Sequence, residues 1–334
     1  MKVAVIGAGS WGTAVAALAA QNAETMLWAR NPELSAAMKR DSRNDSYLSG
    51  IELPVMSFTS ELDEACQGAQ IIVLGVPSHG FRSVLESAAG SISDGATIVS
   101  LVKGLEQGTL LRMTQVAQEV LANHDPSAIG VLTGPNLARE VAEGQPTASV
   151  VAIPDHARAE QVQAAFMSAT FRVYTNPDVV GCEIAGALKN VMAIAAGVVH
   201  GLGYGDNTIA ALITRGLAEL ARLGIALGGS PLTFSGLAGM GDLVATCISD
   251  KSRNRTVGVE LGRGRSLEDV VNEMHMVAEG VKTTRAVLDL AALHGLEMPI
   301  AEQVGAVLYD GRRAGEIVPA LMMRGATSEM HGLG

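Results

Sequence analysis

The chain has 334 residues, of which 48% are hydrophobic, and a formal net charge of -10. This length favours two domains, each large enough to bury its own core. The acidic balance argues against nucleic acid and against membrane insertion, so a local basic cluster points to a small anion as partner. The three cysteines, Cys66, Cys182 and Cys247, lie far apart, form no metal or redox pair and favour a reduced, cytoplasmic location.

The N-terminal segment carries a dinucleotide-binding fingerprint. Residues 2–6 form a short apolar run typical of a β-strand, the motif GAGSWG follows at residues 7–12, and an alanine-rich stretch that predicts a helix comes next. In this context Gly7 permits a tight turn, Gly9 lets the backbone approach a pyrophosphate, and Gly12 lets the helix pack on the strand. The free N–H groups at the helix N-terminus then face the phosphates. A glycine-rich turn without a ligand is the alternative.

The second predicted strand, residues 25–29, bears on the choice of cofactor. An acidic residue about twenty positions beyond the glycine motif usually accepts a hydrogen bond from the ribose 2′-hydroxyl of NAD. Here Arg30 takes that place, and an arginine can pair with a 2′-phosphate, so NADP (NADPH) is favoured while NAD stays possible. Glu24 lies before the strand and Glu33 past it, which argues against either as the missing acid. A surface arginine in contact only with solvent is the alternative.

Further strands and helices alternate as far as residue 177. This alternation predicts a doubly wound, Rossmann-like α/β sheet with parallel strands and ligands at their carboxyl ends. Lys103 and the turn at residues 134–136 follow two of the strands and so lie at such ends; an ordinary exposed lysine is the alternative for Lys103. The additional predicted strands are residues 71–76, 97–102, 128–132, 147–153 and 171–175.

After Pro177 the strand signals disappear. We therefore predict a dinucleotide-binding domain over residues 1–177 and an all-helical substrate and catalytic domain over residues 178–334. Within the second half, almost every residue of the stretch 184–199 is apolar, on every face, which is typical of a buried helix; the stretch is too short for a membrane span and carries Lys189. Further helices are predicted at residues 208–223, 267–275, 280–294, 299–308 and 316–324.

Lys189 lies in the middle of this apolar helix, next to Asn190. Burial disfavours the charged form of a lysine and lowers its pKa, which makes it a usable proton donor and acceptor near neutral pH. The alternative is a lysine that extends to solvent or is paired by Glu183. On the functional interpretation, Lys189 is the catalytic candidate of the chain.

Two later stretches contribute polar groups. The glycine-punctuated run at residues 236–242 ends in an acid, Asp242, although its glycines are also explained by close helix packing. Residues 251–255, KSRNR, bring a hydroxyl, a guanidinium and an amide together, a combination suited to phosphate oxygens. A solvated charged face is the alternative. His200, His275 and His294 show no metal-ligand spacing, so no metal site is predicted.

Six motifs in this order closely resemble those of the bacterial NAD(P)-dependent glycerol-3-phosphate dehydrogenase family: GAGSWGTA, LVKGLE, LTGPNLARE, ALKNVMAIAAG, GLAGMGDLVATC and SRNR. The resemblance extends from Lys2 to about Arg324. It implies a Rossmann-like domain followed by an all-helical one, and reversible reduction of dihydroxyacetone phosphate to sn-glycerol 3-phosphate for phospholipid biosynthesis. The phosphorylated substrate is then the small-molecule partner, and the apolar second half suits a homodimer.

The resemblance also implies roles for individual residues. Lys189 matches the catalytic base of the family, and Asn136 stands where relatives more often carry a small hydroxyl residue. The turn at residues 22–24 is shorter than in relatives. The matching cofactor positions, besides Gly7, Gly9 and Gly12, are Ser10, Trp11, Arg30, Lys103, Ala138, Arg253, Val277 and Glu279. The matching substrate positions are Lys103, Gly134, Asn136, Lys189, Asp242, Ser252, Arg253 and Asn254.

Two other functions fit parts of the pattern. A related β-hydroxyacid dehydrogenase also uses a lysine on a long helix, but its substrate carries a carboxylate. A non-catalytic module that senses the NADPH/NADP ratio would bind nucleotide without turnover. Such a sensor needs neither a buried lysine nor a phosphate clamp. Activity on a hydroxy acid but not on a triose phosphate would favour the β-hydroxyacid dehydrogenase, and binding without turnover would favour the sensor.

Overall fold

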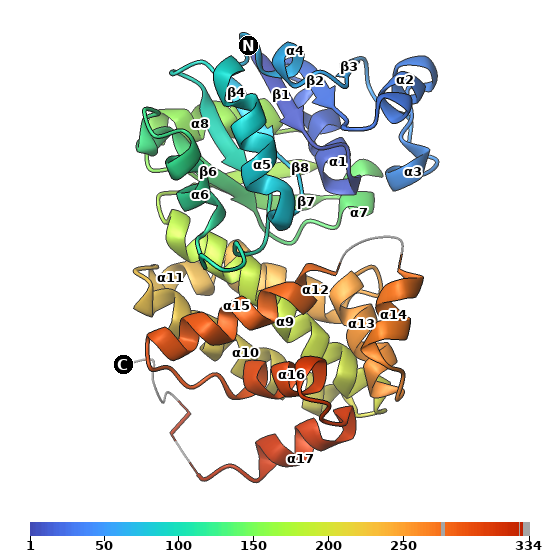
Figure 1. Ribbon diagram of the computed structural model, residues 1–334, viewed down its shortest axis with the longest axis vertical. Helices are drawn as coiled ribbons and strands as arrows, with labels where there is room; N and C mark the ends of the chain where they lie inside the picture. Colours follow the sequence, from blue (N-terminus) through green and yellow to red (C-terminus); the bar gives the residue numbers. More distant parts are fainter. Residues whose placement is uncertain (275–277, 327, 330–334) are drawn as a thin grey trace. The chain divides into compact units, whose positions relative to one another are not determined.

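The protein is described by a computed structural model that covers residues 1–274, 278–326 and 328–329. The chain divides into two compact units (Figure 1). The first comprises Met1–Val102 and Leu111–Val179, and the second comprises Lys103–Leu110 and Val180–Gly334. The segment Lys103–Leu110 thus departs from the uninterrupted first domain expected from the sequence, because Leu105 is buried in the hydrophobic core of the second unit.

An eight-stranded, mostly parallel sheet is the centre of the first unit, and its order is β3-β2-β1-β4-β5-β6-β7-β8. The chain forms β2 and β3 on one side of β1 and then β4 to β8 on the other side, as in a doubly wound fold. The predicted α/β class, with an all-helical region after the sheet, is therefore confirmed. The strands are β1 (Lys2–Ile6), β2 (Glu24–Trp28), β3 (Ser57–Thr59), β4 (Ile71–Leu74), β5 (Thr97–Ser100), β6 (Ile129–Thr133), β7 (Thr147–Ala152) and β8 (Phe171–Asn176).

The last two strands differ from the fully parallel sheet that we expected. β7 pairs antiparallel with β6, with Val131 opposite Ala152, and β8 then pairs parallel with β7. The connection between β6 and β7 contains α7 (Ala138–Ala142), a helix of five residues. Such a helix spans only about 7.5 Å, whereas a parallel crossover must return along a strand of roughly 17 Å. The helix of this connection therefore cannot carry the chain back along the whole strand, and β7 runs antiparallel to β6.

Both faces of the sheet are covered, because alternate residues of β1 enter different cores. Val3 and Val5 pack with side chains of α1 (Ser10–Ala19) and α8 (His156–Phe166). Ala4 and Ile6 pack with side chains of α5 (Ser78–Ala88) and α6 (Met113–Val120). The unit also contains α2 (Pro32–Asp41), α3 (Asp45–Leu48), α4 (Leu62–Cys66) and short 3-10 turns at Ala89–Ser91 and Pro126–Ala128.

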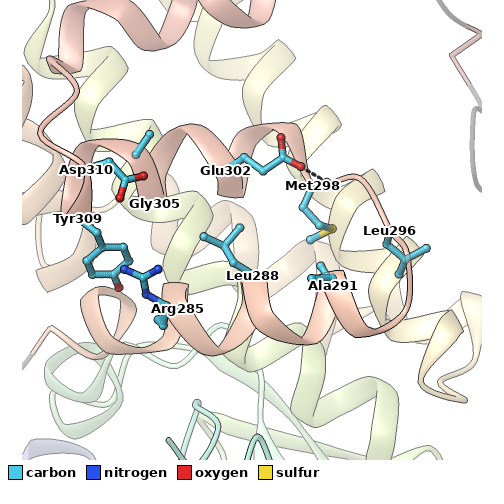
Figure 2. Close-up of a pocket in the computed structure, with 11 residues that line it drawn as sticks. Arg285, Leu288, Ala291, Leu296, Met298, Glu302, Gly305, Tyr309 and Asp310 are labelled. Carbon is cyan, nitrogen blue, oxygen red and sulfur yellow. Dashed lines mark hydrogen bonds between the residues drawn. The ribbon is translucent and has the colours of Figure 1, made fainter. Parts of the chain in front are cut away.

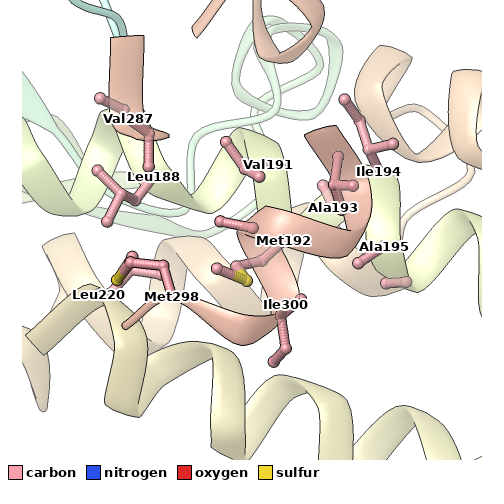
Figure 3. Packing of buried hydrophobic residues seen from close by; sticks show 14 of the residues in the cluster. Leu188, Val191, Met192, Ala193, Ile194, Ala195, Leu220, Val287, Met298 and Ile300 are labelled. Atoms are coloured by element: carbon pink, nitrogen blue, oxygen red, sulfur yellow. The ribbon is translucent and has the colours of Figure 1, made fainter. Parts of the chain in front are cut away.

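The second unit is helical and is built around α9 (Val179–Gly201). Figure 3 shows Leu188, Val191 and Met192 of this helix in the core that also contains Leu220 and Ile300. An 18-residue apolar window of α9 is 94% buried inside the molecule, as in a core helix. The other helices are α10 (Asp206–Ala226), α11 (Pro231–Phe234), α12 (Asp242–Ile248), α13 (Arg253–Gly262), α14 (Leu267–Glu273), α15 (Glu279–Leu293), α16 (Pro299–Tyr309), α17 (Ile317–Met322) and a 3-10 turn at Ala314–Glu316.

A second apolar stretch, Pro231–Ile248, is also long enough to cross a membrane by length and composition, and 44% of it is buried. It is not one regular helix. A π-helical turn at Leu237–Gly241 separates α11 from α12. Turns of this kind widen the helix and are frequent at functional sites, and this one ends directly before Asp242.

Glycines bring α9 and α13 into backbone contact. A Cβ atom added to Gly197 would lie 2.1 Å from the carbonyl oxygen of Arg255, and one added to Gly258 would lie 2.0 Å from that of Ile194. No real side chain tolerates such distances, so glycine is required at both positions. This close approach positions the N-terminus of α13 beside the buried helix.

Candidate functional site

The turn between β1 and α1 has the geometry of an anion cradle. Gly7 has a φ of +122°, and a Cβ there would lie 2.7 Å from the carbonyl oxygen of Gly75. A Cβ at Gly12 would lie 1.9 Å from the carbonyl oxygen of Gly7. Gly9 is the N-cap of α1 and offers no side chain to cap it. The first-turn N–H groups of α1 are therefore open to an anion, and the helix dipole favours one.

Arg30 lies at the same edge of the sheet as this cradle. β1 and β2 pair in parallel with Ile6 opposite Trp28, so both strands end together. The backbone N–H of Gly7 donates to the carbonyl of Trp28 at 3.1 Å, which ties the glycine turn to the end of β2. Arg30 follows two residues later, is exposed, and precedes Asn31, the N-cap of α2. Its position suits contact with a charged group beside the cradle.

The other expected cofactor residues of the first unit surround the start of α1. The hydroxyl of Ser10 donates to the carbonyl of Tyr47 at 2.7 Å. The Nε1 of Trp11 is buried and has no hydrogen-bond partner among the described residues, and its ring centroid lies 6.4 Å from that of Phe171. Ala138 begins α7 and packs against the same core as Trp11.

Gly134 and Asn136 form the turn that follows β6. Gly134 has a φ of +138°, a left-handed conformation that only glycine adopts freely. The amide of Asn136 donates to the carbonyl of Ala148 at 3.2 Å and accepts from the hydroxyl of Ser149 at 3.0 Å. Asn136 therefore holds this turn against β7. A contact between Asn136 and substrate stays a prediction.

In the second unit, two lysines share one buried carboxylate. Lys189 of α9 donates to Oδ1 of Asp242, and Lys103 donates to Oδ2 of the same residue at 2.7 Å. The Lys189 ammonium also donates to Oγ1 of Thr246 at 2.8 Å. The side chains of Lys103, Lys189 and Asp242 are 15%, 7% and 2% exposed, so the cluster is largely withdrawn from water. Lys189 thus neither extends to solvent nor pairs with Glu183, the two alternatives to a functional lysine.

A chain of amides connects this cluster to two further elements. The amide of Asn190 donates to the backbone carbonyl of Lys103 at 3.0 Å and accepts from the amide of Asn254 at 3.0 Å. Asn254 in turn accepts from the backbone N–H of Gly280 at 2.9 Å. A Cβ at Gly280 would lie 2.8 Å from the backbone carbonyl oxygen of Asn190, so glycine is required there. These bonds fix the backbone that carries Lys103.

The predicted phosphate clamp lies at the N-terminus of α13. Ser252 is its N-cap and accepts from the backbone N–H of Arg255 at 3.3 Å. Arg255 is buried and paired with Asp250, whereas Arg253 is exposed, with no side-chain partner among the described residues. A guanidinium and a helix N-terminus at one place suit an anion. Of the two late cofactor positions, Glu279 begins α15, and Val277 lies outside the described residues.

Burial controls the protonation of the buried groups. It lowers the pKa of Lys189 from 10.5 to about 7, while the carboxylate of Asp242 opposes this shift and the ammonium of Lys103 adds to it. A lysine with this pKa can donate and accept a proton under physiological conditions. Burial also raises the pKa of Cys247 to about 12. The Cys247 thiol therefore stays protonated and is not a nucleophile.

Sequence reasoning assigned no role to two residues that contact this cluster, Thr246 and Asn190. Thr246 lies one helical turn after Asp242, and its hydroxyl also donates to the carbonyl of Asp242 at 2.6 Å. The i, i+4 spacing in a short helix is a usable signal for such a pair. Asn190 was visible as a polar residue in an apolar helix, but its partners, Lys103 and Asn254, are 87 and 64 positions away.

A separate pocket of about 370 Å³ lies between α15 and α16 (Figure 2). Leu288, Met298 and Gly305 contribute apolar surface, and Arg285 stacks its guanidinium over the ring of Tyr309 at 4.3 Å. None of its lining residues is among the predicted site residues. The pocket lacks a buried titratable pair and is distinct from the lysine–aspartate cluster.

Comparison with known proteins identifies relatives of the whole chain. Residues 2–159 and 178–319 match the N-terminal and C-terminal families described as NAD-dependent glycerol-3-phosphate dehydrogenase. A glycerol-3-phosphate dehydrogenase (NAD(P)+) of Corynebacterium glutamicum is 52% identical over 333 residues, covering 98% of this chain and 100% of the relative. One from Sphingopyxis alaskensis is 50% identical over 332 residues, covering 99% of each. The crystal structure of the enzyme from Coxiella burnetii has a TM-score of 0.91 at 35% identity and covers 97% and 99% of the two chains.

Proposed function

The chain belongs to the NAD-dependent glycerol-3-phosphate dehydrogenase family, and we propose that Lys189 is the residue that moves the proton in its reaction. As a member of this family, the chain reduces dihydroxyacetone phosphate with NAD(P)H. The observation that carries the proposal is the buried ammonium of Lys189, held by Asp242 and Thr246, with its pKa lowered to about 7.

The residues present fit a dinucleotide. Gly7 and Gly12 leave no room for side chains, the space beside Gly9 is open, and the N–H groups of α1 are uncapped, as a pyrophosphate requires. Ser10, Trp11 and Ala138 lie around it and are the proposed neighbours of the nucleotide. When bound, the nicotinamide supplies the hydride that the reduction needs.

The remaining steps belong to the side chains of the second unit. Lys189 donates its proton to the carbonyl oxygen of the substrate during reduction and takes the hydroxyl proton back during oxidation. Asp242 holds the ammonium in place and limits how far burial lowers its pKa. Ser252, Arg253 and Asn254 are the proposed phosphate clamp, and fixing the phosphate positions the carbonyl for reaction.

Four further proposals concern the cofactor, the assembly, the location and the product. Arg30 supports a preference for NADPH, since its exposed guanidinium can pair with a 2′-phosphate. A homodimer is supported by large apolar side chains exposed on the second unit, such as Leu293 and Met323. A cytoplasmic location is supported by three free, buried cysteines. The product, sn-glycerol 3-phosphate, is a backbone for membrane phospholipids.

The test is nicotinamide absorbance during reaction with dihydroxyacetone phosphate, with NADPH and NADH in parallel. We expect oxidation of both cofactors, faster for NADPH. Faster oxidation of NADH would retain the reaction and contradict the role of Arg30. A protein that oxidises neither cofactor with the triose phosphate, but acts on a β-hydroxy acid, would contradict the proposal as a whole.

A further inference from the structure

Asn44 carries a fully buried amide that extends from a distant loop into the glycine turn. It is the N-cap residue of α3 and is 0% exposed. Its Nδ2 donates to the carbonyl oxygen of Ala8 at 2.9 Å and to Oγ1 of Thr13 at 2.7 Å. An asparagine at an N-cap usually accepts from its own helix, but Asn44 makes no such bond. The fold therefore uses this side chain for the glycine turn.

The bond to Ala8 determines the direction of the next N–H group. The peptide bond between Ala8 and Gly9 is trans, so its C=O and N–H point in opposite directions. By holding the carbonyl of Ala8, Asn44 turns the N–H of Gly9 to the opposite side. The same bond keeps the negative end of the carbonyl dipole from facing an anion at the start of α1.

The bond to Thr13 extends this restraint into α1. Thr13 lies in the first turn of the helix and is 0% exposed, so Asn44 connects the turn before the helix to the helix itself. The hydroxyl of Ser10 also donates to the backbone carbonyl of Tyr47, which follows Asn44 in the same loop region. The side chains of Asn44 and Ser10 thus join the loop to the glycine turn and to the first turn of α1.

The remaining polar atom of Asn44 shows that this side chain is present for its donor bonds. Its Oδ1 is buried and has no hydrogen-bond partner among the described residues. An unsatisfied buried acceptor is destabilising, and a small apolar side chain would avoid it. The two donor bonds therefore account for the choice of asparagine.

We propose that Asn44 is a positioning residue for the dinucleotide: it holds the Ala8–Gly9 peptide so that α1 presents its N–H groups to the pyrophosphate. The inference rests on the proposed dinucleotide site and adds a residue to it. Because NADPH and NADH both contain the pyrophosphate, Asn44 affects the affinity for the two nucleotides equally. Arg30, by contrast, is expected to affect NADPH alone.

The test compares Asn44→Ala with Asn22→Ala. The amide of Asn22 also bridges two carbonyls, those of Ala165 at 3.2 Å and Met167 at 2.8 Å, but it follows the opposite end of α1. For Asn44→Ala we expect the KM and Kd of NADPH and of NADH to rise about tenfold each, with kcat within about twofold and the KM of dihydroxyacetone phosphate unchanged. Asn22→Ala should leave every nucleotide constant unchanged.

Asn44→Asp is the second variant, because it keeps the size of the side chain but removes both N–H donors and adds a negative charge. Its affinity for both nucleotides should fall further than that of Asn44→Ala, with thermal unfolding of all variants followed in parallel. Wild-type nucleotide affinity in Asn44→Ala, or a loss confined to NADPH, would overturn the inference alone. A wild-type protein that binds neither nucleotide would contradict the proposed function as well, so the two failures are distinguishable.

Discussion

Lys189 and Asp242 form a buried ion pair, although they are 53 positions apart in the chain. Burial alone would drive the lysine to its neutral form, and the carboxylate alone would hold the proton too tightly for transfer. The two effects oppose each other and leave the pKa of Lys189 at about 7. This balance gives the lysine a proton that it can both give and take.

The pH dependence of the two directions follows from this pKa. Reduction needs the ammonium form of Lys189, so its kcat should be constant below pH 7 and fall above it; oxidation needs the neutral amine, so its kcat should rise through the same range. Saturating substrate removes the binding step from the comparison, so that kcat reports the groups of the bound complex. Initial rates in both directions between pH 6 and 9 provide the measurement. Parallel profiles for the two directions would contradict the assignment.

The preference for NADPH is tested by Arg30→Ala. Removing the guanidinium should raise the KM for NADPH about tenfold or more, since a charge-assisted contact is lost, and leave that for NADH within about twofold. Lys39→Ala is the matched control, because Lys39 is an exposed cation on the following helix. An equal effect of Arg30→Ala on both cofactors would show that the residue does not contact a 2′-phosphate.

A second buried carboxylate, Glu219, should make stability depend on pH. Burial raises its pKa from 4.5 to about 7, although the backbone N–H groups of Ile300 and Ala301 oppose the shift. The folded state therefore binds more protons than the unfolded state between these values, and the free energy of unfolding should fall as pH rises from about 4.5 to 7. Glu219→Gln should flatten this slope in denaturant unfolding. An unchanged slope would show that Glu219 is not the titrating group.

The close contact between α9 and α13 should be disrupted by one methyl group added at a glycine of the interface. Gly258→Ala would place a Cβ 2.0 Å from the carbonyl oxygen of Ile194, so the helices must separate, at a cost of about 3 kcal/mol. Since α13 carries Ser252 and Arg253, the KM for the phosphorylated substrate should also rise. Gly80→Ala is the control, because that helical glycine has no atom within 4 Å of an added Cβ. A Gly258→Ala variant as stable as wild type would contradict the packing.

Local signals in the sequence were enough to predict the sheet domain and the apolar helix, and to single out Lys189 as the catalytic candidate. The strand and the glycine motif at residues 2–12 are contiguous, so residues adjacent in the sequence determine their geometry. Lys189 was visible because a charged residue stands out in an apolar helix. Its partner Asp242 stood out as the acid that ends a glycine-punctuated stretch, and the family resemblance placed it among the substrate positions.

What could not be predicted depends on contacts between distant segments. The segment 103–110 joins the second unit because of where Leu105 packs, and no local pattern records that. The antiparallel direction of β7 depends on the length of α7. Hydrophobic periodicity in the sequence does not predict the length of a helix to within one turn. No local pattern marks Asn44, since its partner Ala8 lies 36 positions away.

The central claim, that Lys189 moves the proton, is tested most directly by Lys189→Met, which keeps an unbranched side chain but removes the amine. Turnover of dihydroxyacetone phosphate with saturating NADPH should fall by roughly 1,000-fold or more, because general acid catalysis contributes about 100- to 10,000-fold. The Kd for NADPH should stay within about twofold, and Lys282→Ala, which removes an exposed lysine of α15, should change neither. Turnover within about tenfold of wild type, with the fold intact, would contradict the account.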